Sequence, residues 1–320
     1  MNKSDTNPRI CIGVSSCLLG QAVRYDGGHK RDAYINDTLV DYFEFVPVCP
    51  EVAIGLGTPR DPIRLVGDPA TPCAVGVRSK DMDVTGRLER YADKQANKLK
   101  GLSGYIFKRG SPSCGMERVK VYGKNGQSTK TGQGIYAQEL MRRYPQLPAE
   151  EEGRLGDPVL RENFIQRIFI YHDWQKLKRR KLNAKRLVAF HSGLKFVLLA
   201  HNQAAYKRLG QMVARAGKEE ISTLTHNYEL EMMTALKRCA TRKQHTNVLQ
   251  HLAVYLNRDL DAGDKEELGD TIDSYRCGEL PLIVPITLLR HHFRRHPNPY
   301  VARQRYLEPH PRELMLRNAL

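Results

Sequence analysis

Residues 104–115 read GYIFKRGSPSCG, a short apolar run followed by a turn that ends in a single cysteine. The run Tyr105–Lys108 has the length and composition of a buried strand, which the following Gly, Ser and Pro residues interrupt. Cys114 comes just after this turn, with no second cysteine within the roughly two to four residues that separate zinc-knuckle ligands. Any partner of Cys114 must therefore come from another part of the chain.

Two further apolar runs, Ile10–Val14 and Phe43–Val48, resemble the run before Cys114. Short runs without clean alternation favour a parallel sheet that is covered on both faces. A helical pattern begins at Asp83 or Thr85, either of which can serve as the N-cap, and ends at Gly101. Strands and helices in this order predict right-handed crossover units and hence a Rossmann-like α/β domain with a parallel sheet.

The composition changes after Leu147. Before this point the chain is rich in Gly, Pro and short β-branched runs, and after it the sequence has helical periodicity. The segment PQLPAEEEG at residues 145–153 is typical of a linker, because it combines proline, acidic residues and glycine. We therefore predict an α/β domain over residues 1–147 and an all-α domain over residues 148–320.

Three cysteines each follow a predicted strand, namely Cys17, Cys49 and Cys114. The carboxyl ends of parallel strands lie on one edge of an open α/β sheet, where the loops converge to form a crevice. The topology therefore predicts that these three thiols, although far apart in sequence, meet at one place. The remaining cysteines are interpreted as packing or spare thiols: Cys11, Cys73, Cys239 and Cys277.

Three thiols without an obvious fourth ligand limit the choice of cofactor. Structural zinc takes four ligands, and catalytic zinc usually includes histidine or carboxylate. An iron–sulfur cluster is held by thiolates, normally four for a 4Fe-4S centre, so three would leave one iron open. An open iron is a Lewis acid that favours a soft sulfur ligand. From spacing alone, three unrelated buried core thiols remain an alternative.

The charge of the chain is strongly positive, with a formal net charge of +16 and a pI near 9.6. Residues 175–243 contain sixteen Lys or Arg and four acids, a local excess of +12. Such a field attracts a polyanion, with nucleic acid as the first candidate and anionic membrane as the second; a solvated basic face without a partner is the alternative. We select Arg179, Arg180 and Lys185 from the densest run as candidate substrate-binding cations.

The amino-terminal stretch MNKSDTNPRI carries no apolar segment of the kind found in secretory signals, and no apolar run reaches the length of a membrane span. We therefore expect a cytoplasmic protein without a membrane partner. A loop of the Ser-Gly-Gly-x-Asp type is not found, so we expect no nucleotide cofactor. The sequence leaves the oligomeric state open, a monomer included.

Four motifs of the first part resemble the TudS-type thiouracil desulfidase family, and they occur in the family's order: VSSCLLGQAVRYDGG, VCPEVAIGLGTPR, DVTGRL and FKRGSPSCG. The second part resembles the YbgA-like domain through two stretches, DKEELGDTIDSYRCGELPLIVPITLLRHHF and YLEPHP. The order of the two parts is similar to that of the two-domain tRNA 4-thiouridine desulfidase family, and the resemblance covers nearly the whole chain.

This resemblance implies that Cys17, Cys49 and Cys114 bind a 4Fe-4S cluster with one open iron. It also implies a non-redox reaction that converts 4-thiouridine in tRNA to uridine and releases sulfide, with the helical part binding tRNA. Three other functions stay open: a tRNA thiolation enzyme, a desulfidase of free thiouracils, and an iron–sulfur nucleic-acid-binding sensor without turnover.

The reaction needs a base for water and a proton donor for the ring or the leaving group. We predict Glu51 as the base, because it lies two residues after Cys49, and Ser111 and Ser113 as groups that orient the substrate or relay a proton. Asp26 and Lys108 are candidate substrate-binding residues. For Asp26 the sequence RYDGG favours instead a turn that it caps together with the glycines.

Overall fold

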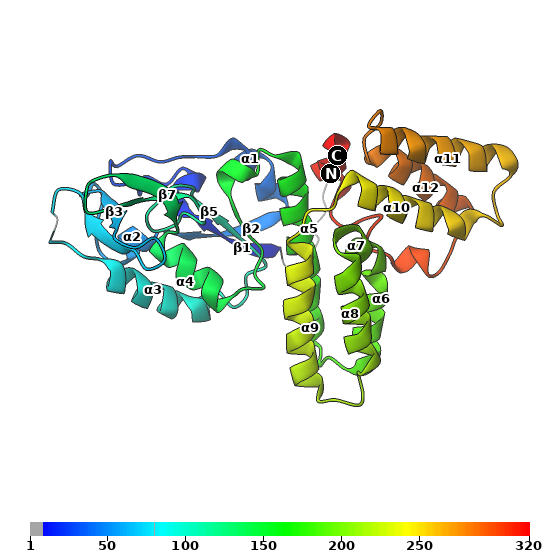
Figure 1. The fold of residues 1–320 in the computed structure, drawn as a ribbon, viewed down its shortest axis with the longest axis horizontal. Coiled ribbons are helices and arrows are strands. Elements are labelled where there is room, and N and C mark those ends of the chain that lie inside the picture. The colour runs from blue at the N-terminus through cyan, green and yellow to red at the C-terminus, as the bar shows by residue number, and fades with distance from the viewer. Residues whose placement is uncertain (1–8, 80) are drawn as a thin grey trace, which may run out of the picture. The chain divides into compact units, whose positions relative to one another are not determined.

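The computed structural model describes residues 9–79 and 81–320, and the chain divides into two compact units, Met1–Gly156 and Asp157–Leu320. The first unit is α/β and the second is helical, which confirms the predicted fold class (Figure 1). The division falls after Gly156 rather than after Leu147. The linker interpretation of residues 145–153 is wrong, because β8 (Ala149–Glu151) pairs with a strand of the first unit.

A parallel four-stranded sheet forms the centre of the first unit, with the strand order β2-β1-β5-β8. The predicted strands are confirmed as β1 (Ile10–Ser15), β2 (Phe43–Val48) and β5 (Tyr105–Phe107). Because β2, β1 and β5 are adjacent in the sheet, the loops that follow them emerge side by side at one edge. This edge is where the three selected cysteines lie.

Gly13 permits the close packing of β1 against the aromatic ring of Tyr105. A β-carbon at this position would stand 2.3 Å from a ring carbon of Tyr105, well inside contact distance. Tyr105 in turn stacks on Phe107 with ring centroids 4.2 Å apart, and both side chains are fully buried. A side chain larger than hydrogen would therefore displace the central strand pair.

A second, mixed four-stranded sheet has the strand order β4-β3-β6-β7, and sequence reasoning did not anticipate it. It comprises β3 (Ile63–Val66), β4 (Cys73–Gly76), β6 (Val119–Tyr122) and β7 (Ser128–Gly132). One face is buried against the beginnings of α3 (Thr85–Lys98) and α4 (Ile135–Arg143) through an apolar cluster that includes Leu65, Leu88, Val121 and Ile135. The predicted helix is confirmed, and Asp83 accepts a hydrogen bond from the Thr85 amide at 2.8 Å.

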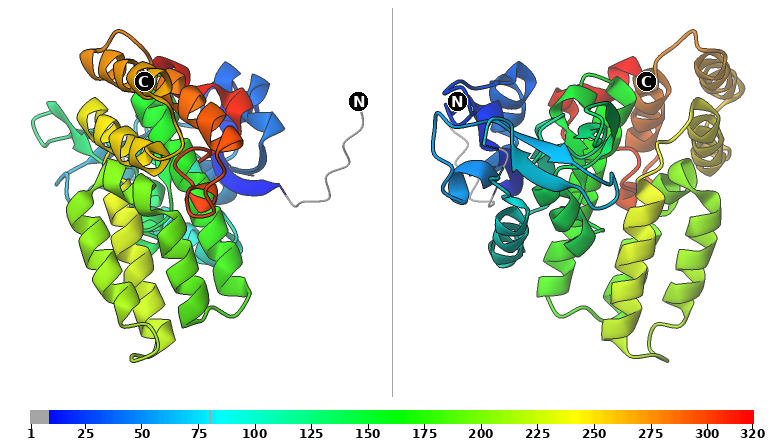
Figure 2. Two further views of the ribbon diagram at one scale, coloured as in Figure 1. Left: turned by 90° about the vertical axis from the view of Figure 1, so that its right-hand side faces the viewer. Right: turned by 60° about the vertical axis from the view of Figure 1, so that its left-hand side comes forward.

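The second unit consists of helices joined by short turns. Figures 1 and 2 show α6, α8 and α9 running side by side along most of their length. Its helices are α5 (Pro158–Arg179), α6 (Ala184–Gly193), α7 (Lys195–His201), α8 (Gln203–Ala214), α9 (Ile221–Leu236), α10 (Arg242–Ala253), α11 (Ala262–Cys277) and α12 (Ile283–Arg295).

Two polar features organise this helical unit. Thr241 and Gln244 form a capping box at the beginning of α10, in which each side chain bonds the backbone of the other residue. In the interior, the carboxylate of Glu162 lies 3.1 Å from the guanidinium of Arg317 and 3.5 Å from the ring of His310. All three side chains are almost fully buried, so the two partners compensate the charge of the Glu162 carboxylate inside the core. No helix in the described part of the chain is long and apolar enough to cross a bilayer.

Candidate functional site

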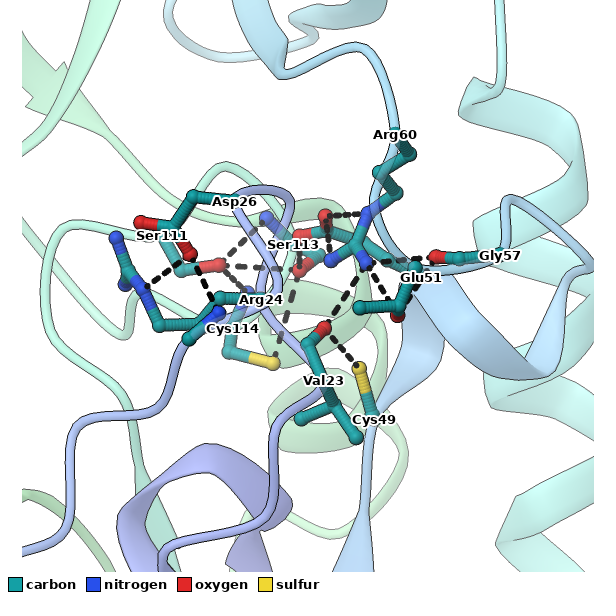
Figure 3. A network of polar contacts seen from close by, with 12 residues as sticks. Val23, Arg24, Asp26, Cys49, Glu51, Gly57, Arg60, Ser111, Ser113 and Cys114 are labelled. Carbon is teal, nitrogen blue, oxygen red and sulfur yellow. Dashed lines mark hydrogen bonds and ion pairs between the residues drawn. The ribbon is translucent and has the colours of Figure 1, made fainter.

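The three cysteines that the sequence selected all line one cavity of about 290 Å³. Cys17 lies in the short 3-10 helix Ser16–Leu19 directly after β1, and Cys49 is the residue before α2 (Pro50–Ala53), directly after β2. Cys114 lies in the turn after β5. Each thiol thus comes from the carboxyl end of a parallel strand, as predicted, and Figure 3 shows Cys49 and Cys114 beside the polar network of the site.

Burial keeps these thiols in the neutral form when no metal is bound. Burial is the largest cause of the raised pKa of all three thiols. The pKa of Cys17 is raised to about 11. The neighbouring thiol of Cys49 raises this pKa further, whereas Lys108 and Arg24 lower it. The pKa values of Cys49 and Cys114 are also raised, and for Cys114 the nearby Cys49 adds to burial. The Cys49 thiol thus raises the pKa of both other thiols, as expected for three sulfurs that lie close together.

The donor set of three thiols in one cavity fits the thiolate ligation of an iron–sulfur cluster. Among the described residues no three His, Cys, Asp or Glu side chains lie within reach of one metal ion. The thiolates of a cluster bind different irons, so they stand farther apart than the ligands of one ion. Two buried hydroxyls, those of Tyr105 and Tyr136, lie near Cys114, and the charge of its thiolate contributes to raising the pKa of both. Ligation by three thiols stays a prediction.

Glu51 is held at the centre of the site by two partners. One carboxylate oxygen accepts a hydrogen bond from the Ser113 hydroxyl at 2.6 Å. The other accepts two from the Arg60 guanidinium, at 2.7 Å from Nη2 and 3.0 Å from Nε. Figure 3 shows Glu51 between Ser113 and Arg60. Two fixed partners leave this carboxylate one orientation, which faces the same cavity as the thiols.

The two serines continue this contact as a directed chain of hydrogen bonds. Ser111 Oγ accepts from the amides of Ser113 at 3.3 Å and Cys114 at 3.1 Å, so its own hydrogen is free for Ser113 Oγ, 3.0 Å away. The Ser113 hydrogen is in turn directed to Glu51. Because a carboxylate only accepts, the chain runs from Ser111 through Ser113 to Glu51. Such a chain can carry a proton toward the carboxylate.

Arg60 is the site residue that sequence reasoning missed. Besides its two bonds to Glu51, it donates to the carbonyl oxygens of Val23 and Gly57, each at 2.9 Å. It thereby ties the loop after the 3-10 helix Ser16–Leu19 to the segment after α2 and fixes the carboxylate between them. The motif VCPEVAIGLGTPR contains this arginine nine residues after Glu51, but nothing in a single sequence marks that spacing as a contact.

The two predicted substrate-binding residues of the first unit differ in their surroundings. Lys108 lines the cavity and its ammonium pairs with Glu152. Asp26 is not among the described residues that line the cavity; its carboxylate accepts from the Gly28 amide at 3.0 Å and lies 3.5 Å from Arg24. The backbone bond from Gly28 is the main reason that the pKa of Asp26 is lowered. The structure therefore favours the turn-capping interpretation of Asp26.

Arg179, Arg180 and Lys185 lie at the turn between α5 and α6 and are exposed. No ion pair joins them to a carboxylate within residues 9–79 and 81–320. Three other cations of the basic run are paired with carboxylates: Lys178 with Glu229, Arg208 with Glu231 and Arg215 with Glu219. The substrate-binding role of Arg179, Arg180 and Lys185 stays a prediction.

The geometry defines a two-unit protein. Its α/β unit contains three thiols in one cavity, and a helical unit follows. Residues 12–152 match the family model described as 2-thiouracil desulfurase, and residues 195–311 match one described as a protein of unknown function, DUF1722. The chain therefore belongs to the family that combines a 2-thiouracil desulfurase domain with a YbgA-like helical domain.

Two curated relatives each match about half of the chain. The uncharacterized protein YbgA of Escherichia coli is 34% identical over 159 residues, which are 49% of this chain and 94% of the relative. The uncharacterized protein YbbK of Bacillus subtilis is 34% identical over 147 residues, 44% of this chain and 96% of the relative. A solved structure, described as the [4Fe-4S]-dependent thiouracil desulfidase TudS, is 32% identical and covers 47% of this chain and 95% of its own, with a TM-score of 0.37.

Proposed function

We propose that this protein is an iron–sulfur-dependent desulfidase that converts 4-thiouridine in tRNA to uridine without a redox step. The observation that carries the proposal is the meeting of Cys17, Cys49 and Cys114 in one cavity with the Glu51 carboxylate. The 2-thiouracil desulfurase model over residues 12–152 supports a thiolated pyrimidine as the reacting group. The reaction replaces the C4–S bond by a C4–O bond from water, and the sulfur leaves as hydrosulfide.

The three thiolates would hold a 4Fe-4S cluster, whose open iron supplies a Lewis acid with affinity for the sulfur of the substrate. The chain's own residues supply the proton transfers. Glu51 receives the proton of the attacking water through the Ser113 hydroxyl, because that hydroxyl already donates to the carboxylate at 2.6 Å. Ser111 holds the orientation of Ser113.

Arg60 and Lys108 set the electrostatics of this step. Arg60 keeps the Glu51 carboxylate in place through two charge-assisted bonds. Lys108 lies near Cys17 and lowers the pKa of that thiol, so it favours the thiolate that a metal requires. Its ammonium is paired with Glu152, donates to a backbone carbonyl and also lines the cavity, where its third N–H can donate a hydrogen bond to the substrate.

The helical unit supplies the affinity for tRNA in this proposal. The free cations Arg179, Arg180 and Lys185 at the α5–α6 turn are suited to phosphate contacts, which give affinity without reading sequence. Binding through phosphates should weaken steeply as salt is raised. We place the reaction in the reducing cytoplasm, where free thiols persist.

The test is a turnover assay on protein that is purified and loaded with iron and sulfide without oxygen. The protein is incubated with tRNA that contains 4-thiouridine, and nucleosides and released sulfide are then measured. We expect loss of 4-thiouridine, gain of uridine and an equal amount of sulfide. A parallel arm with free 2-thiouracil distinguishes the tRNA desulfidase from a free-base enzyme, and loss of sulfur from the free base alone would contradict the tRNA substrate.

A matched pair of variants assigns the result to the cavity. Cys114→Ala should lose both the cluster absorption and the turnover. Cys73→Ala removes an exposed thiol outside the cavity and should retain both. Glu51→Gln should keep the cluster and reduce turnover on the order of a hundredfold or more. Wild-type turnover by Glu51→Gln would show that the base is another group.

A further inference from the structure

The outward face of the second sheet carries cations from three adjacent strands. Along β6 the side chains alternate, with Val119 and Val121 buried and Lys120 exposed. Lys120 lies directly opposite Lys130 of β7. On the other side, Leu65 of β3 is in register with Val121, so Arg64 occupies the position next to Lys120. We call Arg64, Lys120 and Lys130 the cationic sheet face.

This arrangement is unfavourable for the isolated fold. Like charges directly opposite each other on antiparallel strands destabilise a sheet. Within the described residues no carboxylate forms an ion pair with Lys120 or Lys130. The sequence from 118 to 138 contains four cations and no acid, so compensation does not come from within the hairpin. A bound anion would remove this repulsion, which makes the row a candidate for function.

Protection of a sheet edge does not explain the row. Lysine on an edge strand discourages pairing with other chains, and Lys130 on β7 could serve this purpose. Lys120 and Arg64, however, lie on the interior strands β6 and β3, where no edge is exposed. The β6–β7 pair also has a register irregularity at Val119 and Lys120, which already disrupts regular pairing near the edge.

The residues around the row indicate which anion it suits. The Arg64 guanidinium lies over the ring of Tyr122, 5.1 Å from the ring centroid, which fixes it as a flat positive surface. The exposed residues of β7 before Gly132 are polar: Ser128, Thr129, Lys130 and Thr131. A surface that inserts into a membrane needs exposed apolar side chains among its cations, and this strand offers none. Spaced cations with polar neighbours match the phosphates of a polynucleotide.

We propose that the cationic sheet face binds the phosphate backbone of the nucleic-acid substrate. This inference rests on the proposed function and adds a second contact surface, on the unit that holds the thiols. β3 begins at Ile63, which lines the cavity, and β6 follows the turn that contains Cys114. The face thus belongs to strands that also adjoin the site, and it can bind a polynucleotide, whereas a single nucleoside has no phosphate chain to offer it.

The experiment compares two charge-reversed forms of the full-length chain. The first carries Lys120→Glu and Lys130→Glu. The matched control carries Lys94→Glu, in α3, and Lys100→Glu, just after it, both exposed positions that undergo the same change of net charge. Binding of fluorescently labelled tRNA is measured over a range of salt concentrations. We expect the first form to bind on the order of tenfold more weakly, with a salt slope lower by about 2, and the control to stay within about twofold of wild type.

Two further measurements decide between outcomes. Turnover of free 4-thiouridine should be the same in both forms, so a loss confined to tRNA supports the face. Lys130→Glu alone turns a repulsive pair into an attractive one and should raise the thermal midpoint while it weakens tRNA binding. An unchanged tRNA affinity in the double variant would overturn the proposal. The proposal would also be overturned if wild type bound phosphatidylserine vesicles, the double variant did not, and the double variant still bound tRNA like wild type. Because binding is measured without turnover, a failure of the desulfidase proposal is seen separately.

Discussion

The ion pair between Glu51 and Arg60 gives the sharpest prediction about the stability of the site. Its side chains are only 12% and 6% exposed, and Arg60 makes two bonds to the carboxylate and two to backbone carbonyls. Arg60→Ala leaves Glu51 buried with the Ser113 hydroxyl as its remaining partner. Removing one partner of a buried pair costs about 3–5 kcal/mol of the free energy of unfolding.

A matched exposed pair provides the control. Arg142 and Glu139 lie 2.6 Å apart on α4, and the Arg142 side chain is 68% exposed. Such a pair contributes about 0–1 kcal/mol, because solvent screens it. We therefore expect Arg142→Ala to be nearly silent while Arg60→Ala lowers the urea midpoint of the first unit by roughly 2 M, taking about 4 kcal/mol and a slope of about 2 kcal/mol per M.

The two units must be followed separately in this assay. The chain has one tryptophan, Trp174, which is fully buried in α5, so its fluorescence reports the second unit. Hydrogen exchange of the β1 and β5 amides reports the first unit. We expect Arg60→Ala to affect the exchange but not the fluorescence transition. Equal small shifts for Arg60→Ala and Arg142→Ala would refute the view that the buried pair organises the site.

Three other predictions concern the two units. Gly13→Ala should destabilise the first unit by about 1–3 kcal/mol, because its β-carbon meets the Tyr105 ring, and thermal unfolding of the variant measures this. Thr241→Ala removes the capping box of α10 and should cost the second unit about 1 kcal/mol, read from the midpoint of Trp174 fluorescence; an unchanged midpoint would contradict a stabilising cap. Burial opposes ionisation of Glu162, but its histidine and arginine partners outweigh burial and lower its pKa. Its contribution is therefore complete above the pKa of about 4.3 in the unfolded chain and is lost as the pH falls below that value, so Glu162→Gln should flatten the acid limb of the stability curve of the second unit.

The sequence was sufficient for three of the four strands of the central sheet, because these strands are short apolar runs that end in recognisable turns. The three predicted strands fall within one residue of the observed bounds at each end. Their adjacency then follows from parallel crossover topology, which is why Cys17, Cys49 and Cys114 could be brought together without a structure. The serine turn next to Cys114 and the proximity of Glu51 followed from the same placement.

The second sheet was missed because its strands do not have that pattern. β7 reads STKTG and is exposed along most of its length, so no apolar run marks it. β8, the fourth strand of the central sheet, was taken for a linker because AEE is polar, although two of its three residues are buried and the strand pairs with β5. Arg60 was missed for a different reason, since a contact between a loop arginine and Glu51 depends on tertiary placement.

The central claim is that three cavity thiols hold one cluster and leave one iron open to the sulfur of the substrate. The most direct measurement is Mössbauer spectroscopy of the protein loaded with iron-57, recorded with and without 4-thiouridine. We predict one iron that is distinct from the other three and whose signal alone changes when 4-thiouridine is added but not when uridine is added. Four equivalent irons that are indifferent to 4-thiouridine would contradict the account.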